Sequence, residues 1–168
     1  MSRMGGIAGP AGRGMSDGRW SDIDADTAAA VDHFSGAIQI CRATGLHDDT
    51  MDGYMRRMAF MHAMLAGHTS LEKALLRILQ IQGEEAPSGS QWLADLIQRA
   101  GRATDSRPGI LPAALVQAAD RTRKFRHAVV RAYDTFDPDD AEPAVRAAEK
   151  VAAGLQPAMV ASRQAIDP

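Results

Sequence analysis

Apolar residues recur every three or four positions along most of the chain, and this is the spacing of one face of an α-helix. Five helices follow from this pattern and from the Gly, Pro and Asp residues that interrupt it. Short connections between them predict an all-α bundle. The helices are expected over about residues 21–45, 49–82, 92–101 and 112–133, and in a last segment that carries Ala144 to Leu155.

The second predicted helix is the longest and carries the clearest packing face. Six of its residues recur at steps of 3, 4, 3, 4 and 3, which predicts a coiled-coil-like seam against a neighbouring helix. Gly67 interrupts this seam and allows either a close helix approach or a mild kink. The six residues are Met61, Met64, His68, Leu71, Leu75 and Ile78.

The first 20 residues differ from the rest in composition. They contain six glycines and Pro10, and such a segment buries too little apolar surface to offset the entropy of ordering it. We therefore predict a flexible tail over residues 1–20 and one helical domain over residues 21–168.

An acidic cluster marks the expected start of the first helix. Ser21 is predicted to cap this helix, and the helix dipole favours anions in the turns that follow. A calcium loop is the alternative interpretation, but the glycine and the closing glutamate of such a loop are absent. The acidic residues are Asp22, Asp24 and Asp26.

Composition and charge narrow the class of protein further. Aromatic residues make up only 5% of the chain, and helix-favouring residues predominate, which argues against an all-β fold. The net charge of −2 gives no reason to expect a chain-wide coat for nucleic acid or membrane. No apolar stretch approaches the roughly 20 residues of a membrane span. The lone Cys41 excludes an intrachain disulfide and a Cys-based zinc site, which fits a reducing cytoplasm. His33, His47 and His62 share no metal-ligand spacing, and we expect no metal and no cofactor.

The overall charge hides a local asymmetry on the fourth predicted helix. Five cations fall within eleven residues that contain no acid, and five acidic residues follow immediately. At 100° per residue, the apolar residues of this segment form one stripe and the cations fall mostly opposite. The cationic side is either a solvated basic face, as most charge runs are, or a polyanion site. The cations are Arg121, Arg123, Lys124, Arg126 and Arg131, with His127 among them and Tyr133 just beyond.

Three stretches of the chain resemble the HepT-like toxins of the HEPN superfamily. Residues 125–134, FRHAVVRAYD, resemble the signature helix of these toxins, and residues 69–78, TSLEKALLRI, resemble their second helix. The stretch from Gly83 to Trp92 resembles a subset of the group. The resemblance covers roughly residues 50–165.

This resemblance implies a fold, an activity and a partner. It implies an all-helical homodimer whose signature helices meet across a cleft. It implies a metal-independent endoribonuclease that acts as the toxin of a type VII-like toxin–antitoxin pair. The implied partner is a minimal nucleotidyltransferase antitoxin, which neutralises the toxin by adenylylating the motif tyrosine.

The chain departs from the family motif at one position. The motif is Arg, four to six residues, His, any residue and Tyr; Arg126 and Tyr133 match its ends, but Arg131 stands where the His is expected. A permanently charged guanidinium is a poor proton shuttle. Three interpretations are open. His127 replaces the missing histidine, which we favour; or Arg121 to His127 satisfies the looser spacing without a following tyrosine; or the protein binds RNA without cutting it.

In the mechanism that we expect for such a ribonuclease, the 2′-hydroxyl of RNA loses its proton and the negative charge on the phosphorane is stabilised. His127 is predicted to move protons, while Arg126 and Arg131 grip the phosphate. Tyr133 is predicted to position RNA and to be the modification site. The cations predicted to widen the RNA-binding footprint, and to make binding salt-sensitive, are Arg121, Arg123 and Lys124.

Two other residues have less specific interpretations. His68 lies on the packing seam and is expected to be a core residue or a buried hydrogen-bonding group. Glu72 lies one turn later and is expected to pair with His68 or with a cation of the signature helix.

Two further function classes compete with the ribonuclease. One is a non-catalytic helical RNA-binding or substrate-binding accessory subunit of a nucleotidyltransferase, which Arg131 favours. The other is a structural helical dimer with an incidental basic face. Loss of cleavage in an Arg126 variant would separate the ribonuclease from both.

Overall fold

The computed structural model describes residues 13–167, and these residues form an all-α bundle with no β-strand among them. The predicted all-α fold is therefore confirmed. Two short 3₁₀ turns, η1 (Tyr133–Thr135) and η2 (Pro138–Asp140), separate the last two helices. The five helices are α1 (Arg13–Arg42), α2 (Met51–Ile81), α3 (Trp92–Gly101), α4 (Ala113–Arg131) and α5 (Ala141–Ile166).

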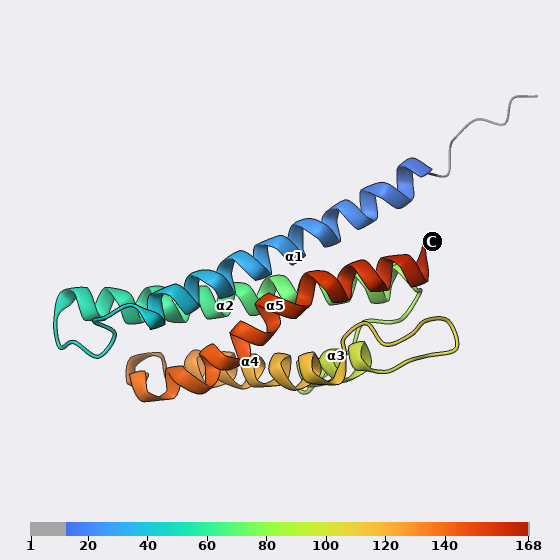
Figure 1. Cartoon of the computed structure of the whole chain (residues 1–168). Coiled ribbons are helices and arrows are strands. Elements are labelled where there is room, and N and C mark those ends of the chain that lie inside the picture. Colours follow the sequence, from blue (N-terminus) through green and yellow to red (C-terminus); the bar gives the residue numbers. More distant parts are fainter. Residues whose placement is uncertain (1–12, 168) are drawn as a thin grey trace, which may run out of the picture.

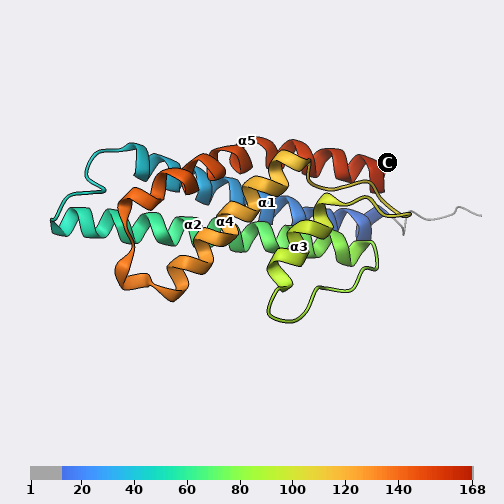
Figure 2. The same ribbon diagram turned by 90° about the horizontal axis from the view of Figure 1, so that it is seen from below.

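The three longest helices, α1, α2 and α5, form the body of the bundle. Helix α1 packs along both α2 and α5, and Figure 1 shows the three running side by side. Helix α4 packs against α5 and α2, and the short α3 packs against α4 and α2. Figure 2, seen from below, shows α4 and α3 crossing that side of α2. This arrangement places the basic signature helix between the longest helix and the C-terminal helix.

The predicted seam of α2 is confirmed as its buried face. All six residues of the seam are at most 1% exposed. At Gly67 the ring of Phe34 from α1 lies so close that an added Cβ would come within 2.9 Å of it. Gly67 therefore permits the close approach of α1 to α2, which is one of the two roles predicted for it. The helix begins at the Thr50 cap, whose hydroxyl accepts from the Gly53 backbone N–H at 3.1 Å.

The predicted start of the first helix is wrong. Helix α1 begins at Arg13, eight residues before Ser21, so Ser21 lies inside the helix and does not cap it. Trp20 is only 2% exposed. Burial of so large an apolar side chain stabilises this part of the helix through tertiary contacts, which the glycine-rich composition of the first 20 residues did not indicate. Of the predicted tail, residues 1–12 lie outside the described residues.

The acidic cluster near the start of α1 makes ion pairs between helices instead of occupying a first turn. Asp26 and Asp22 accept from Arg77 of α2 at 2.7 and 3.2 Å. Asp24 lies 3.5 Å from Arg163 of α5. These pairs are largely exposed, so each adds little to stability, and they correct the predicted capping role.

Candidate functional site

The cations of the signature helix do not form a single patch, because α4 directs them to different sides. Arg123, Arg126 and His127 line one small pocket of about 160 Å³ with the residues that begin α3. The pocket therefore holds two guanidinium groups and one imidazole. The α3 side of the pocket is formed by Ser90, Gln91, Leu93 and Ala94.

Arg126 connects this pocket to the interior of the bundle. Its side chain is 31% exposed, and its guanidinium lies 3.7 Å from Oε1 of Glu72 on α2. The Glu72 side chain is only 8% exposed. An acidic residue beneath a half-buried arginine fixes the orientation of the guanidinium and leaves its outer donors for an anion. The predicted pairing of Glu72 with a cation of the signature helix is therefore confirmed.

Glu72 also contacts His68, which is fully buried on the α2 seam. Oε1 of Glu72 lies 3.2 Å from Nε2 of His68. On the other side of the ring, Nδ1 of His68 lies 2.9 Å from Oγ1 of Thr122 on α4. Thr122 donates its own hydrogen to the Ala119 carbonyl at 2.9 Å, so Nδ1 must be the donor to Thr122. The neutral ring then presents the lone pair of Nε2 to Glu72.

Burial determines the charge of both groups. It lowers the pKa of His68 to about 3, with Arg126 and Arg123 adding to the effect and Asp120 opposing it. Burial raises the pKa of Glu72, and nearby Arg126 works against that rise. Although they lie 3.2 Å apart, Nε2 of His68 and Oε1 of Glu72 are both buried without a hydrogen-bond partner among the described residues. The buried hydrogen bond from His68 to Thr122 joins α2 to α4, and Glu72 lies between it and Arg126.

We expect His68 to make the stability of the chain pH-dependent. The unfolded residue binds a proton near pH 6.5, whereas the folded residue does so only near a pKa of about 3. The unfolded state therefore binds more protons between these values, and the free energy of unfolding falls as the pH is lowered through them. Between pH 7 and pH 5 this residue alone contributes a loss of about 2 kcal/mol. The raised pKa of Glu72 acts in the opposite direction at its own titration.

Urea unfolding at the two pH values tests this expectation. The pH-dependent loss should shrink in His68→Gln, which keeps a donor for Thr122 without a titrating ring. His62→Gln is the matched control, because His62 is an exposed histidine of the same helix. An unchanged pH dependence in His68→Gln would show that the ring is not the titrating group.

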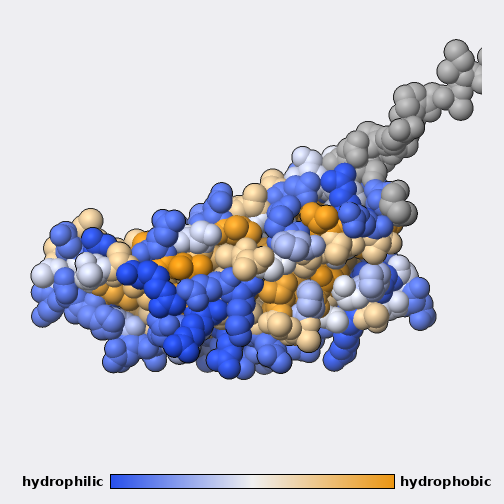
Figure 3. All heavy atoms as spheres, in the orientation of Figure 1, coloured by the Kyte–Doolittle hydropathy of each residue, from blue (hydrophilic) through white to orange (hydrophobic). Residues whose placement is uncertain are grey.

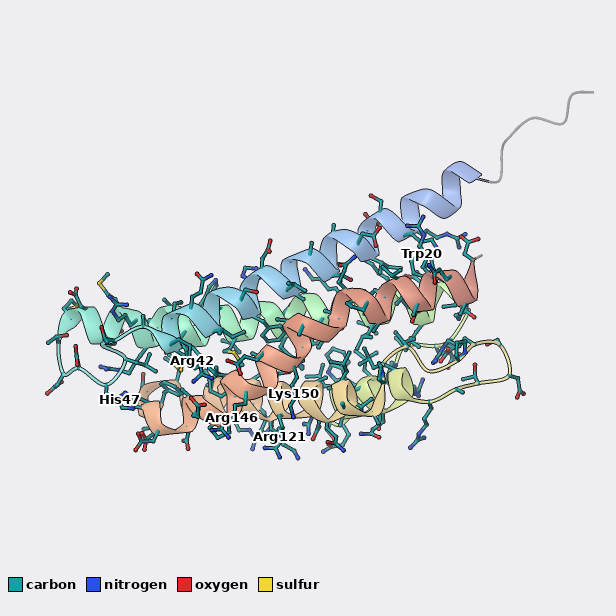
Figure 4. The ribbon with its side chains drawn as sticks, in the orientation of Figure 1. Trp20, Arg42, His47, Arg121, Arg146 and Lys150 are labelled. Carbon is teal, nitrogen blue, oxygen red and sulfur yellow. The ribbon has the colours of Figure 1, made fainter. Side chains whose placement is uncertain are left out.

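The three residues predicted to widen the RNA footprint are separated in the structure. Arg123 and Lys124 both bind Asp120, at 2.7 and 2.9 Å. Arg121 instead lines a groove of about 620 Å³ between α4 and α5, together with Arg146 and Lys150. Figure 4 shows these three side chains gathered on one side of the bundle, and Figure 3 shows that this face is strongly hydrophilic. Glu142 and Asp139 also line this groove, so it carries both signs of charge.

The structure corrects the position of Tyr133 and places Arg131 at the helix end. Helix α4 ends at Arg131, so Tyr133 lies in the turn η1 and not on the helical face with Arg126. The chain leaves the helix at Ala132, whose φ of −135° and ψ of 47° are not helical. Tyr133 is 41% exposed and lines a different groove, with Tyr54 of α2. The pocket of Arg126 and His127 therefore includes neither Arg131 nor Tyr133.

Sequence reasoning missed the part of the pocket that α3 supplies. Ser90 and Gln91 come from a turn whose place beside α4 depends on the tertiary packing of α3. Thr122 carried no signal either, because a threonine within a helix is an ordinary residue. The signal that was available is the i, i+4 spacing of His68 and Glu72 on an otherwise apolar seam, since buried polar residues usually bind one another.

The described residues contain no group of three or more His, Cys, Asp or Glu side chains that could hold a metal ion. Within the same residues, no helix is both long and apolar enough to cross a membrane. Cys41 is half-buried against the core, and burial, followed by the nearby Glu142, raises the pKa of its thiol. A raised pKa disfavours the reactive thiolate, so Cys41 is a packing residue.

Comparison with known proteins identifies the family. A sequence profile described as HepT-like protein matches residues 59–166, which span most of α2 and all of α3, α4 and α5. Neither the curated proteins nor the solved structures compared with the chain give a match. Because the profile covers more than half of the sequence, the chain belongs to the HepT-like family of the HEPN superfamily, a family related to toxin–antitoxin systems.

Proposed function

We propose that this protein is the toxin of a type VII-like toxin–antitoxin pair and a metal-independent endoribonuclease that acts in the cytoplasm. The observation that carries the proposal is the pocket in which Arg123, Arg126 and His127 converge, with Glu72 holding Arg126 from behind. Two guanidinium groups match the oxygens of a phosphodiester, and an imidazole supplies a group suited to proton transfer near neutral pH.

In the proposed reaction His127 takes the proton from the 2′-hydroxyl, whose oxygen then attacks the adjacent phosphorus. Arg126 stabilises the negative charge that develops on the phosphorane oxygens, where oriented cations have their largest effect. The bond to the 5′-oxygen breaks, and that oxygen takes a proton from water, while the protonated His127 returns its own proton to solvent. The products are a 2′,3′-cyclic phosphate and a 5′-hydroxyl, so no metal is needed to supply a nucleophile.

The proposal includes the partners that the family context suggests. The chain pairs with a second copy, which brings another set of cationic groups to a shared cleft. A minimal nucleotidyltransferase antitoxin adenylylates Tyr133, whose 41% exposure leaves its hydroxyl accessible to an enzyme. Arg131, exposed at the end of α4 two residues earlier, contributes a phosphate contact beside this tyrosine.

Cleavage of labelled RNA in EDTA tests the proposal, with His127→Ala as the decisive variant. General acid–base catalysis contributes about 10²- to 10⁴-fold, so we expect a rate loss of that order. His62→Ala is the control, because it removes an exposed histidine from α2 outside the pocket. A His127→Ala rate equal to that of His62→Ala would remove His127 from the chemistry.

One observation favours a second candidate function. Arg131 occupies the position of the motif histidine, and a guanidinium does not exchange protons near neutral pH. The alternative is a non-catalytic RNA-binding or substrate-binding accessory subunit of a nucleotidyltransferase. Salt-sensitive RNA binding without cleavage by unmodified wild-type protein would establish this alternative.

A further inference from the structure

The groove that Tyr133 lines lies apart from the pocket of Arg126 and His127. It is formed between the first half of α2 and the segment 133–136, and its volume is about 510 Å³. This volume falls in the range of small-molecule sites in proteins. Its lining residues are Tyr54, Arg57, Met58, Met61, Tyr133, Asp134 and Phe136.

Aromatic packing holds the segment 133–136 against α2. The Phe136 ring packs on Phe60 of α2 and on Phe125 of α4, with ring centroids 5.9 and 5.8 Å apart. Phe60 and Phe125 also meet each other edge to face at 5.6 Å. This three-ring cluster fixes the chain three residues after Tyr133, so Tyr133 is held beside the groove and does not lie on a free loop.

The groove combines an apolar floor with exposed aromatic residues. Met61 is buried and Met58 and Phe136 are half-buried, while Tyr54 and Tyr133 are 50% and 41% exposed. Large exposed apolar side chains are few in a folded chain, and those near one another mark binding surfaces. Exposed tyrosine rings offer flat faces on which bases of any sequence can stack.

Two polar side chains that line the groove can form hydrogen bonds with the edge of a base. Nη1 of Arg57 donates to the backbone carbonyls of Leu46 and Asp48 at 2.9 and 3.0 Å, which fixes its guanidinium in place. Arg57 and Asp134 both line the groove, and they supply N–H donors and a carboxylate acceptor respectively. A fixed donor and an acceptor beside aromatic faces match the donor and acceptor edges of an unpaired nucleobase.

We propose that this groove binds one unpaired nucleobase of a single-stranded RNA, with Tyr54 and Tyr133 stacking on it and Arg57 and Asp134 contacting its edge. Arg131, exposed at the end of α4 just before the segment 133–136, supplies a contact to the RNA backbone. The inference rests on the proposed function in taking RNA as the ligand. It concerns binding, which can be measured separately from cleavage.

The test uses a short unstructured 2′-O-methyl RNA with one 2-aminopurine, because blocking the 2′-hydroxyl prevents cleavage. Wild-type protein should bind this probe and change the fluorescence of its 2-aminopurine. Stacking on one aromatic side chain is worth about 5-fold or more in affinity, so Tyr54→Ala should weaken binding at least that much. Tyr54→Phe keeps the ring and should bind like wild type. Val160→Ala is the control, because Val160 is 46% exposed on α5 and lies outside the groove.

Each other result overturns the proposal. Equal affinities of Tyr54→Ala and Val160→Ala, or no binding of the probe by wild type, would show that the groove does not hold a base. A change of solution mass in Tyr54→Ala without a change in RNA affinity would make the groove a protein interface. Cleavage of natural RNA is scored separately: cleavage with Tyr54-independent binding refutes only the groove, whereas Tyr54-dependent binding without cleavage refutes only the ribonuclease.

Discussion

Arg126→Ala should lower the rate of RNA cleavage at least 100-fold while the chain stays folded. Removing one oriented donor to a developing anion typically costs 10²- to 10³-fold in rate, and Arg126 is the pocket cation that also contacts buried Glu72. The fold should tolerate the change. Arg126 works against the burial that raises the pKa of Glu72, so without Arg126 that pKa rises further and the buried carboxyl more readily takes up a proton.

The measurement is the single-turnover rate of cleavage in EDTA, accompanied by circular dichroism and thermal unfolding of each variant. Arg146→Ala is the control, since it removes an exposed arginine of α5 that lines the α4–α5 groove instead. Arg126→Lys should recover only part of the rate, because an ammonium cannot reproduce the bidentate geometry of a guanidinium. Wild-type turnover in folded Arg126→Ala would refute the role assigned to this residue.

Helical periodicity predicted most of the fold because burial follows it closely. The step of three and four residues located α2, and the six residues of its seam became its buried face. The same approach failed at the start of α1, where glycines and acidic residues predicted a tail and a cap. The helix instead continues back to Arg13, and Trp20 is buried. Local propensity could not show this burial, which depends on neighbours distant in the sequence.

The candidate site was predictable only within single helices. The i, i+4 relation of His68 and Glu72 follows from sequence, and so do the positions of Arg123, Arg126 and His127 on nearby turns. The sequence could not show that α4 ends at Arg131, which removes Tyr133 from their face. Nor could it show that α3 closes the pocket, because a contact between two elements is set by tertiary packing.

Arg107 shows the same limit in the connection between α3 and α4. The sequence predicts only a loop here and gives no sign that the Arg107 side chain is completely buried. Its guanidinium forms a bidentate pair with Glu84, which follows α2. It also donates to the carbonyls of Arg99, Arg102 and Pro108 at 3.2, 2.8 and 3.2 Å. One side chain thus joins the end of α2, the end of α3 and the loop.

Arg107→Ala should lower the free energy of unfolding by about 3 kcal/mol, because breaking a buried ion pair costs about 3 to 5 kcal/mol and Glu84 stays partly exposed. Domains of this kind are stable by only about 5 to 15 kcal/mol, so urea unfolding should show a large shift of the midpoint. Arg102→Ala is the control, since Arg102 is an exposed arginine of the same loop. A shift equal to that of Arg102→Ala would refute a structural role for the Arg107 guanidinium.

A double variant separates the ion pair from the carbonyl contacts. Glu84→Gln removes the charge that Arg107→Ala leaves unpaired, so the two substitutions together should destabilise less than the sum of the single changes. The remaining loss then reports on the three carbonyl contacts, two of which lie at the end of α3, where a cation also complements the helix dipole. Full additivity would mean that Glu84 is satisfied by water without Arg107. In that case the stability of the connection would come from the carbonyl contacts alone.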